Sequence, residues 1–239
     1  MSAPQARPRP HPSTGTRLSI VLPVLNEAAG IVPTLRALAP LRARGVEVVV
    51  ADGGSTDGTA ALATPWADQV LHAPRGRALQ MNAGAAAATG AALLFLHADT
   101  QLPDDADRHV LAALAAGAHW GRFDVRIQGR HPVLPVVAAA MNLRSRWTGI
   151  ATGDQALFLQ RALFQQLGGF PEQPLMEDVE LCRRLRAAQA RPACLRQRVT
   201  TSGRRWDTHG AWRTIVLMWR LRWRYWRGEP ASTLAKLYK

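Results

Sequence analysis

The sequence is short of cysteines, of acidic residues and of long apolar runs, and each shortage excludes a class of protein. Two cysteines, Cys182 and Cys194, occur in 239 residues. They are too few for a disulfide-rich scaffold, so we expect a reduced, cytoplasmic setting. No apolar run approaches the about 18 residues that a membrane-spanning helix needs. Residues 18–25 are apolar but continue into Asn26 and Glu27, which favours a strand over a signal peptide.

Acidic residues are also outnumbered, 17 against 30 Lys and Arg, which gives a net charge of +13. Residues 18–203 carry only +3 of this excess, whereas residues 1–17 carry +3 and residues 204–239 carry +7. We therefore expect a nearly neutral body with a basic tail and no nucleic-acid partner. Residues 1–16 are rich in Pro and Arg without apolar periodicity, so this basic N-terminus is predicted to be disordered.

From residue 17 onward, apolar strand patterns alternate with helical ones. This alternation predicts an α/β fold with a parallel sheet in a first half, about residues 17–100. A second half, about residues 101–203, shows a looser pattern. The predicted strands cover residues 18–24, 46–51, 70–72, 93–97, 121–127 and 156–159. The predicted helices cover residues 29–44, a short segment after Asp57, and residues 78–89, 104–116, 133–147 and 177–188.

Three acidic residues follow predicted parallel strands, where ligand sites gather. Glu27 ends the segment PVLNE, Asp52 opens DGGSTDGT, and Asp99 closes LLFLHAD. The Asp52 carboxylate suits a base or ribose, but the same segment would equally end a strand and cap a helix. Asp99 is interpreted as a ligand of Mg²⁺ or Mn²⁺ bridging a diphosphate. Its neighbour His97 is interpreted as a packed histidine.

Other candidates lie near helix starts. Arg77 begins the helical segment RALQMNAGAAA, where positive charge and free N–H groups attract phosphate, although most such arginines are merely solvated. Glu177 and Asp178 open another helix. They either compensate its dipole, worth about 0.3–1 kcal/mol, or supply a general base. Residues 153–155, with the sequence GDQ, hold an acceptor hydroxyl or build a turn.

Five segments in this order resemble family 2 glycosyltransferases with the GT-A fold: PVLNE, DGGSTDGT, GRALQMNAGAAAATGAALLFLHADT, GDQALF and GGFPEQPLMEDVELCRRLR. The resemblance covers roughly residues 18–190. The GRRW segment and the surroundings of HAD resemble more narrowly the selenodomain-associated or arsenosugar-biosynthesis transferases. The implied architecture is a Rossmann-like mixed sheet with helices on both faces and a C-terminal helical tail.

The resemblance also implies roles for individual residues. The first half would bind the nucleotide donor and the second half the acceptor, with Asp178 as the catalytic base and Asp99 as the metal ligand. The implied donor-binding residues are Pro23, Glu27, Asp52, Arg77, Asp99 and Arg205. The implied acceptor-binding residues are Gly153, Asp154, Gln155, Glu177 and Trp206.

Two departures from the family pattern limit these roles. His97 replaces the first Asp of the DxD motif, which leaves one firm carboxylate for the cation. Ser202 stands where processive members carry the Gln of QxxRW, so we expect a non-processive enzyme.

The predicted function is inverting, metal-assisted transfer of a sugar from a nucleotide-diphosphate donor to a small-molecule or lipid hydroxyl. The alternatives are nucleotidyltransferase-like diphosphate chemistry and a non-enzymatic membrane adaptor. An adaptor has no use for four acids at such positions. Nucleotidyl transfer gathers its carboxylates around metal, whereas Asp178 lies far downstream of Asp99.

Between residues 211 and 227 the tail places Trp212, Val216, Trp219, Trp223 and Trp226 on one helical stripe. Arg213, Arg220, Arg224 and Arg227 fall on the neighbouring stripe. This composition suits a helix in an anionic headgroup layer at the inner membrane face, or one joining two protomers. A terminal helix with its tryptophans buried in the core is the alternative.

Overall fold

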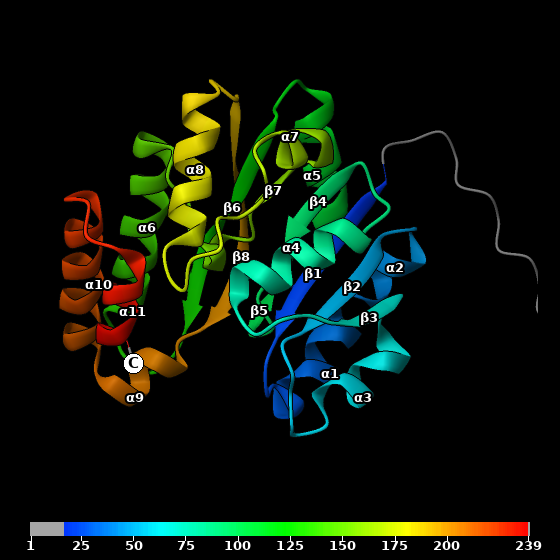
Figure 1. Ribbon diagram of the computed structural model, residues 1–239, viewed down its shortest axis with the longest axis horizontal. Coiled ribbons are helices and arrows are strands. Elements are labelled where there is room, and N and C mark those ends of the chain that lie inside the picture. The colour runs from blue at the N-terminus through cyan, green and yellow to red at the C-terminus, as the bar shows by residue number, and fades with distance from the viewer. Residues whose placement is uncertain (1–16, 239) are drawn as a thin grey trace, which may run out of the picture.

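The computed structural model describes residues 17–238, apart from the side chain of His209. Its helices cover both faces of a single sheet (Figure 1). The strands are β1 (Leu18–Val24), β2 (Glu47–Asp52), β3 (Gln69–His72), β4 (Ala92–Phe95), β5 (Thr100–Gln101), β6 (Trp120–Gln128), β7 (Phe158–Gln160) and β8 (Pro192–Ser202). Their order in the sheet is β3-β2-β1-β4-β7-β6-β8-β5.

The helices lie between these strands and after the last of them. They are α1 (Ala28–Ala37), α2 (Ala39–Ala43), α3 (Thr59–Ala63), α4 (Arg77–Ala87), α5 (Ala106–Ala115), α6 (Leu134–Thr148), α7 (Arg161–Gln166), α8 (Glu177–Ala187), α9 (Arg204–His209), α10 (Ala211–Trp226) and α11 (Ala231–Leu237). Two short 3-10 turns, η1 (Thr64–Trp66) and η2 (Gly153–Gln155), complete the described elements.

The first four strands are parallel, as the alternating pattern predicts. The register pairs Val24 of β1 with Asp52 of β2, so the carboxyl ends of these strands meet at one edge. Beyond β4 the sheet becomes mixed, because β7 is antiparallel to both β4 and β6, whereas β8 is parallel to β6. This arrangement confirms the predicted mixed α/β sheet.

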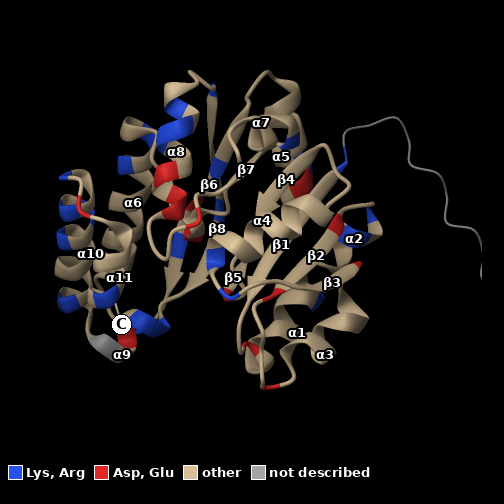
Figure 2. Ribbon diagram, in the orientation of Figure 1, with Lys and Arg blue, Asp and Glu red and all other residues tan. Residues whose placement is uncertain are grey.

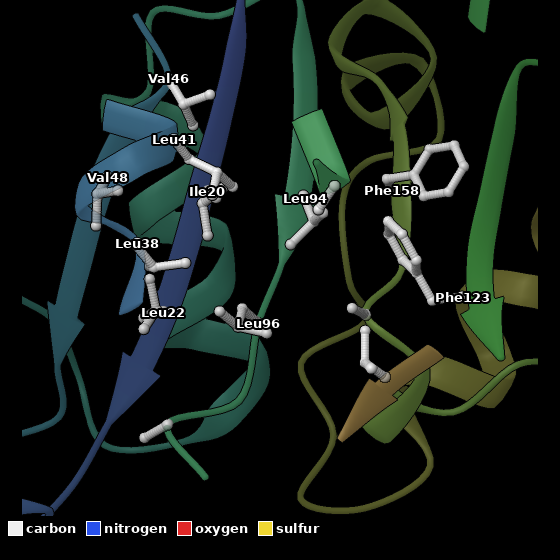
Figure 3. Close-up of a cluster of buried hydrophobic side chains, with 14 of the residues drawn as sticks. Ile20, Leu22, Leu38, Leu41, Val46, Val48, Leu94, Leu96, Phe123 and Phe158 are labelled. Carbon is white, nitrogen blue, oxygen red and sulfur yellow. The ribbon is translucent and has the colours of Figure 1, made fainter. Parts of the chain in front are cut away.

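Two hydrophobic cores fill the space between sheet and helices. Ile20 and Leu22 of β1 face one core beside Leu38 and Leu41 (Figure 3). Val21 faces the opposite core, where it packs with residues of α4. Side chains alternate along a strand, so a strand buried on both faces is apolar throughout.

The single helix predicted over residues 29–44 is wrong, because the structure divides it at Leu38. Pro40 lacks the N–H that would continue the hydrogen bonding of α1 into α2, and proline is tolerated in the first turn of a new helix. Strand β8 was not predicted at all. It pairs along β6 from Pro192 to Ser202, but exposed arginines at 196 and 198 break its apolar pattern.

The tail folds back onto the second half. Leu221 of α10 and Leu234 of α11 form a small third core with Leu175 and Met176, which immediately precede α8. Within residues 17–238, none of the helices combines the length and apolar character needed to cross a membrane. The predicted disorder of residues 1–16 lies outside the described residues.

Candidate active site

A cavity of about 680 Å³ opens at the carboxyl ends of β1 and β4. Its wall brings together the loops after these strands, the start of α4, turn η2, the end of β8, helix α9 and the tail. The predicted site residues in its wall are Pro23, Glu27, Arg77, Asp99, Asp154, Arg205 and Trp206. Asp52, Gly153, Gln155, Glu177 and Asp178 are not among its lining residues.

Asp52 shapes the loop after β2. Its buried carboxylate accepts hydrogen bonds from the backbone N–H groups of Gly54 (3.1 Å) and Ser55 (3.0 Å) and from the Ser55 hydroxyl. In the same loop, Asp57 accepts hydrogen bonds from the N–H groups of Thr59 and Ala28, where α3 and α1 begin. These hydrogen bonds are the ones expected if the segment ends a strand and caps a helix.

Glu27 lies beside that loop with its carboxylate in the cavity wall. Its backbone N–H donates to the Thr59 hydroxyl at 2.8 Å, which fixes its position. Burial raises the pKa of Glu27, and the negative charge of Asp99 adds to this, while Arg204 acts in the opposite direction. Glu27, Asp99 and Arg204 thus interact electrostatically across one wall, although they come from three separate segments.

Gln80 braces the same edge of the sheet and was missed by the sequence analysis. It is 4% exposed, and its Nε2 donates to the carbonyl oxygens of Val24 (2.6 Å) and Ala51 (3.1 Å). These bonds hold the ends of β1 and β2 beside the cavity. A glutamine within a helical pattern gives no sequence signal for this role, since most are solvated.

His97 faces an acidic partner in the cavity wall. Its Nδ1 lies 3.3 Å from Oδ1 of Asp154, and its side chain is 15% exposed. Burial would raise the pKa of Asp154, but the hydrogen bond and charge of His97, with Arg77 and Arg144, lower it overall. A Cβ atom on Gly153 would overlap the His97 ring, so the glycine permits this close approach.

Asp178 lies next to η2, outside the cavity wall. Its two carboxylate oxygens accept hydrogen bonds from the backbone N–H groups of Gly153 (2.8 Å) and Val179 (2.7 Å). Burial and the adjacent Glu177 raise the pKa of Asp178 to about 6, against the effect of these N–H groups and of Arg77. A carboxylate with a pKa in this range suits proton transfer near neutral pH.

Arg77 connects the two sides of the site. Its Nη1 lies 3.3 Å from Oε1 of Glu177, which is buried. Burial would lower the pKa of Arg77, but the charges of Glu177, Asp178 and Asp154 raise it overall. The Arg77 guanidinium at the start of α4 is therefore held in place by acidic residues of the second half.

The tail supplies Tyr238 as a residue of the cavity wall, which the sequence did not indicate. The Arg205 guanidinium lies 3.7 Å from the centroid of the Tyr238 ring and donates to the Tyr238 carbonyl oxygen at 2.7 Å. Burial raises the pKa of Tyr238, with Arg205 and Arg77 opposing. The last described residue therefore closes one side of the cavity.

Arg144 of α6 is a third residue that the sequence did not indicate. Burial lowers its pKa even though Asp178 and Asp154 lie near it. Its Nε is buried, and no described residue accepts a hydrogen bond from it. A basic residue inside an amphipathic helix gives no signal that it points toward a site.

Few of the described side chains in the site could bind a metal ion. Among the described side chains, no group of three or more His, Cys, Asp or Glu could hold a metal ion. Asp99 is exposed in the cavity wall, and the Thr100 hydroxyl donates to it at 3.5 Å. One carboxylate fits a cation that takes its remaining ligands from a diphosphate and water.

Residues 19–163 match the model of glycosyl transferase family 2. The chain belongs to this family. It is 33% identical over 172 residues to the PGL/p-HBAD biosynthesis glycosyltransferase of Mycobacterium tuberculosis, covering 64% of this chain and 62% of the relative. It is 36% identical over 196 residues to the succinoglycan biosynthesis protein ExoA of Rhizobium meliloti, covering 72% of this chain and 58% of the relative. The chain thus spans about three-fifths of the length of these relatives.

Among solved structures, the fold is similar to that of a mannosyltransferase from Pyrobaculum calidifontis in complex with GDP-Man and Mn²⁺. The TM-score is 0.65 at 23% identity, over 90% of this chain and 62% of the other. The predicted GT-A fold is confirmed, as is the predicted family.

Proposed function

We propose that the protein transfers a sugar from a nucleotide-diphosphate donor to a hydroxyl acceptor with inversion at the anomeric carbon. One observation carries the proposal. Asp178, with its pKa raised to about 6, is hydrogen-bonded to Gly153, while the adjacent Asp154 lines the same cavity as Arg77, Asp99 and Arg205. Pro23, Glu27 and Asp52 are assigned to the nucleoside side of the donor.

The leaving diphosphate gains negative charge as the glycosidic bond breaks. Arg77, at the first turn of α4, and Arg205 across the cavity would stabilise that charge by preorganised electrostatics. Bound at Asp99, Mg²⁺ or Mn²⁺ would add positive charge at the diphosphate. The Pyrobaculum mannosyltransferase holds Mn²⁺ together with GDP-Man, which supports a divalent cation beside the donor.

Asp178 is assigned as the base, and the acceptor hydroxyl has to reach it from the cavity past η2, because Asp178 is not in the cavity wall. It would take the proton of the acceptor hydroxyl as the hydroxyl oxygen bonds to the anomeric carbon and the nucleoside diphosphate leaves from the opposite side. A single displacement inverts the configuration and needs no enzyme nucleophile. Gly153, Asp154, Gln155, Glu177 and Trp206 are assigned to the acceptor side.

Several finer assignments complete the proposal. The acceptor is a small molecule or a lipid, the enzyme is non-processive, and it works in the cytoplasm at the inner membrane face. The selenodomain-associated or arsenosugar-biosynthesis transferases remain the proposed subgroup. Family membership argues against a non-enzymatic adaptor. The position of Asp178, on a helix of the second half, argues against nucleotidyl transfer.

Asp178→Asn tests the assignment of the base. The variant should keep the thermal stabilisation given by the best donor among UDP-, GDP- and TDP-sugars, with and without Mn²⁺. At about 100 times the dissociation constant this amounts to about 2.7 kcal/mol. Transfer should fall by about 10²–10⁴-fold. Glu172→Gln, at an exposed acid in the preceding loop, is the matched control. Normal turnover in Asp178→Asn would refute the assignment, and silence across all donors would refute the proposed substrate class.

A further inference from the structure

Helix α10 presents a continuous apolar stripe to solvent. Its members lie three or four residues apart and are between 56% and 82% exposed: Trp212, Val216, Trp219, Trp223 and Trp226. The alternative in which these tryptophans fill the domain core is therefore wrong. Large contiguous apolar patches are rare on soluble monomers, and where they occur they mark interaction sites.

The opposite side of α10 is fixed on the domain. Leu221 is fully buried in the third core with Leu175 and Leu234, and Thr214 and Met218 line the cavity. The helix cannot rotate its tryptophans inward without breaking these contacts. The exposed stripe is thus a consequence of how the tail packs.

Positive charge flanks the stripe. Arg213, Arg220 and Arg227 are exposed, and helical geometry places them about a quarter turn from the tryptophans. Figure 2 shows basic residues on successive turns of α10. The Arg227 guanidinium lies 5.0 Å from the centroid of the Trp223 ring, which keeps this charge at the edge of the aromatic surface.

We propose that α10 docks in the headgroup layer of an anionic membrane, with its tryptophans toward the acyl chains and its arginines on lipid phosphates. Tryptophan suits this layer because its ring is apolar and its N–H is polar. Each arginine near such a surface contributes about 1 kcal/mol of attraction. A second copy fits less well, because α10 carries no acidic residue to pair with the arginines that both copies would bring to a two-fold interface. Nucleic acid fits less well because this face is a row of tryptophans on one helix, not a basic groove.

Docking has a consequence for the acceptor. Because the inner side of α10 lines the cavity, a docked enzyme would hold its site within one helix diameter of the lipid surface. An acceptor hydroxyl carried on a lipid then becomes the favoured substrate class. This last step rests on the proposed function, whereas the docking itself does not.

The test is co-sedimentation of the full chain with vesicles of phosphatidylcholine and phosphatidylglycerol in equal parts, compared with phosphatidylcholine alone. The wild type should sediment with the mixed vesicles, less so as salt rises. Trp219→Ser with Trp226→Ser should lower the bound fraction by about tenfold. Arg213→Gln with Arg220→Gln should remove the preference for phosphatidylglycerol. The matched controls are Leu62→Ser, at an exposed leucine of α3, and Arg108→Gln, at an exposed arginine of α5.

Each outcome decides something. No sedimentation of the wild type, or equal loss in the stripe and control variants, would overturn the docking proposal. A wild-type dimer that becomes monomeric in the tryptophan variant, without vesicle binding, would overturn it in favour of a second copy. A thermal unfolding curve, measured without lipid or donor, shows that each variant is folded. Vesicle binding without any sugar transfer would count against the proposed function alone.

Discussion

The two sides of the cavity are built in different ways. On the donor side, short loops follow consecutive parallel strands, and the bonds of Asp52 and Asp57 join residues within the same or the adjacent loop. On the acceptor side, η2, α8, α9 and Tyr238 meet only because the second half and the tail fold over one another. The donor side is thus built from the loops of neighbouring parallel strands, whereas the acceptor side depends on packing between the second half and the tail.

This difference suggests that the acceptor side can change its substrate more readily than the donor side. A diphosphate needs the same charges whatever sugar it carries, so a phosphate site at the ends of parallel strands suits one donor class. The acceptor side can change with the tail and with α8 while the strands stay as they are. Four measurements would test this difference.

Arg77→Gln removes the guanidinium group that connects the donor side with the acceptor side. The diphosphate would lose a stabilising charge, and Glu177 would lose its partner at 3.3 Å. We expect a fall in kcat/KM of about 10²–10³-fold, measured with the best donor of the thermal-shift panel. Arg183→Gln, at an exposed arginine of α8, should leave kcat/KM near the wild-type value. An equal loss in both variants would mean that the overall charge matters and the position of Arg77 does not.

Gly153→Ala perturbs the acceptor side at the point where turn η2 contacts His97. The added methyl group would overlap the His97 ring and shift the N–H group that binds Asp178. A displacement of this kind costs about 10²-fold in transfer, while the donor-induced thermal shift should stay. Gly30→Ala is the control, because nothing lies within 4 Å of its new Cβ atom. Loss of donor binding would show that the two sides are not separable.

The pH dependence of kcat/KM reports on Asp178. Its pKa is raised to about 6, and only the ionised carboxylate accepts a proton. Below that pH the ionised fraction falls, so kcat/KM should drop about tenfold per pH unit. The measurement is a pH profile at subsaturating acceptor, with donor binding followed in parallel. A flat profile between pH 5 and 7 would contradict the assigned base.

Gly84→Ala tests the packing that supports the donor side. A Cβ atom on Gly84 would overlap the Val21 side chain, so α4 would have to move away from β1. We expect a loss of about 1–3 kcal/mol in the free energy of unfolding, measured by chemical denaturation. Gly30→Ala should instead raise the free energy of unfolding by up to about 1 kcal/mol. Alanine lowers the conformational entropy of the unfolded chain, and the helix has room for its methyl group. A neutral Gly84→Ala would mean that this contact relaxes at no cost.

Sequence reasoning succeeded where the signal was local. Strand β1 has the predicted bounds, and the stripe and the arginines of α10 follow directly from helical periodicity. It failed where a signal was masked, as in β8, whose exposed arginines hide the strand pattern. The sequence near position 97 also gave no indication that His97 contacts Asp154.

Local sequence patterns were enough to predict the alternation of strands and helices, the acids at strand ends and the composition of the tail. These features depend on periodicity and on neighbouring residues. Tertiary structure decided that Gln80 bonds a carbonyl 56 positions away and that Asp178 meets Gly153 across 25 positions. It also decided that the tryptophans of α10 face outward. Burial, pKa and exposure arise from contacts between distant segments, and no local pattern records which segments will meet.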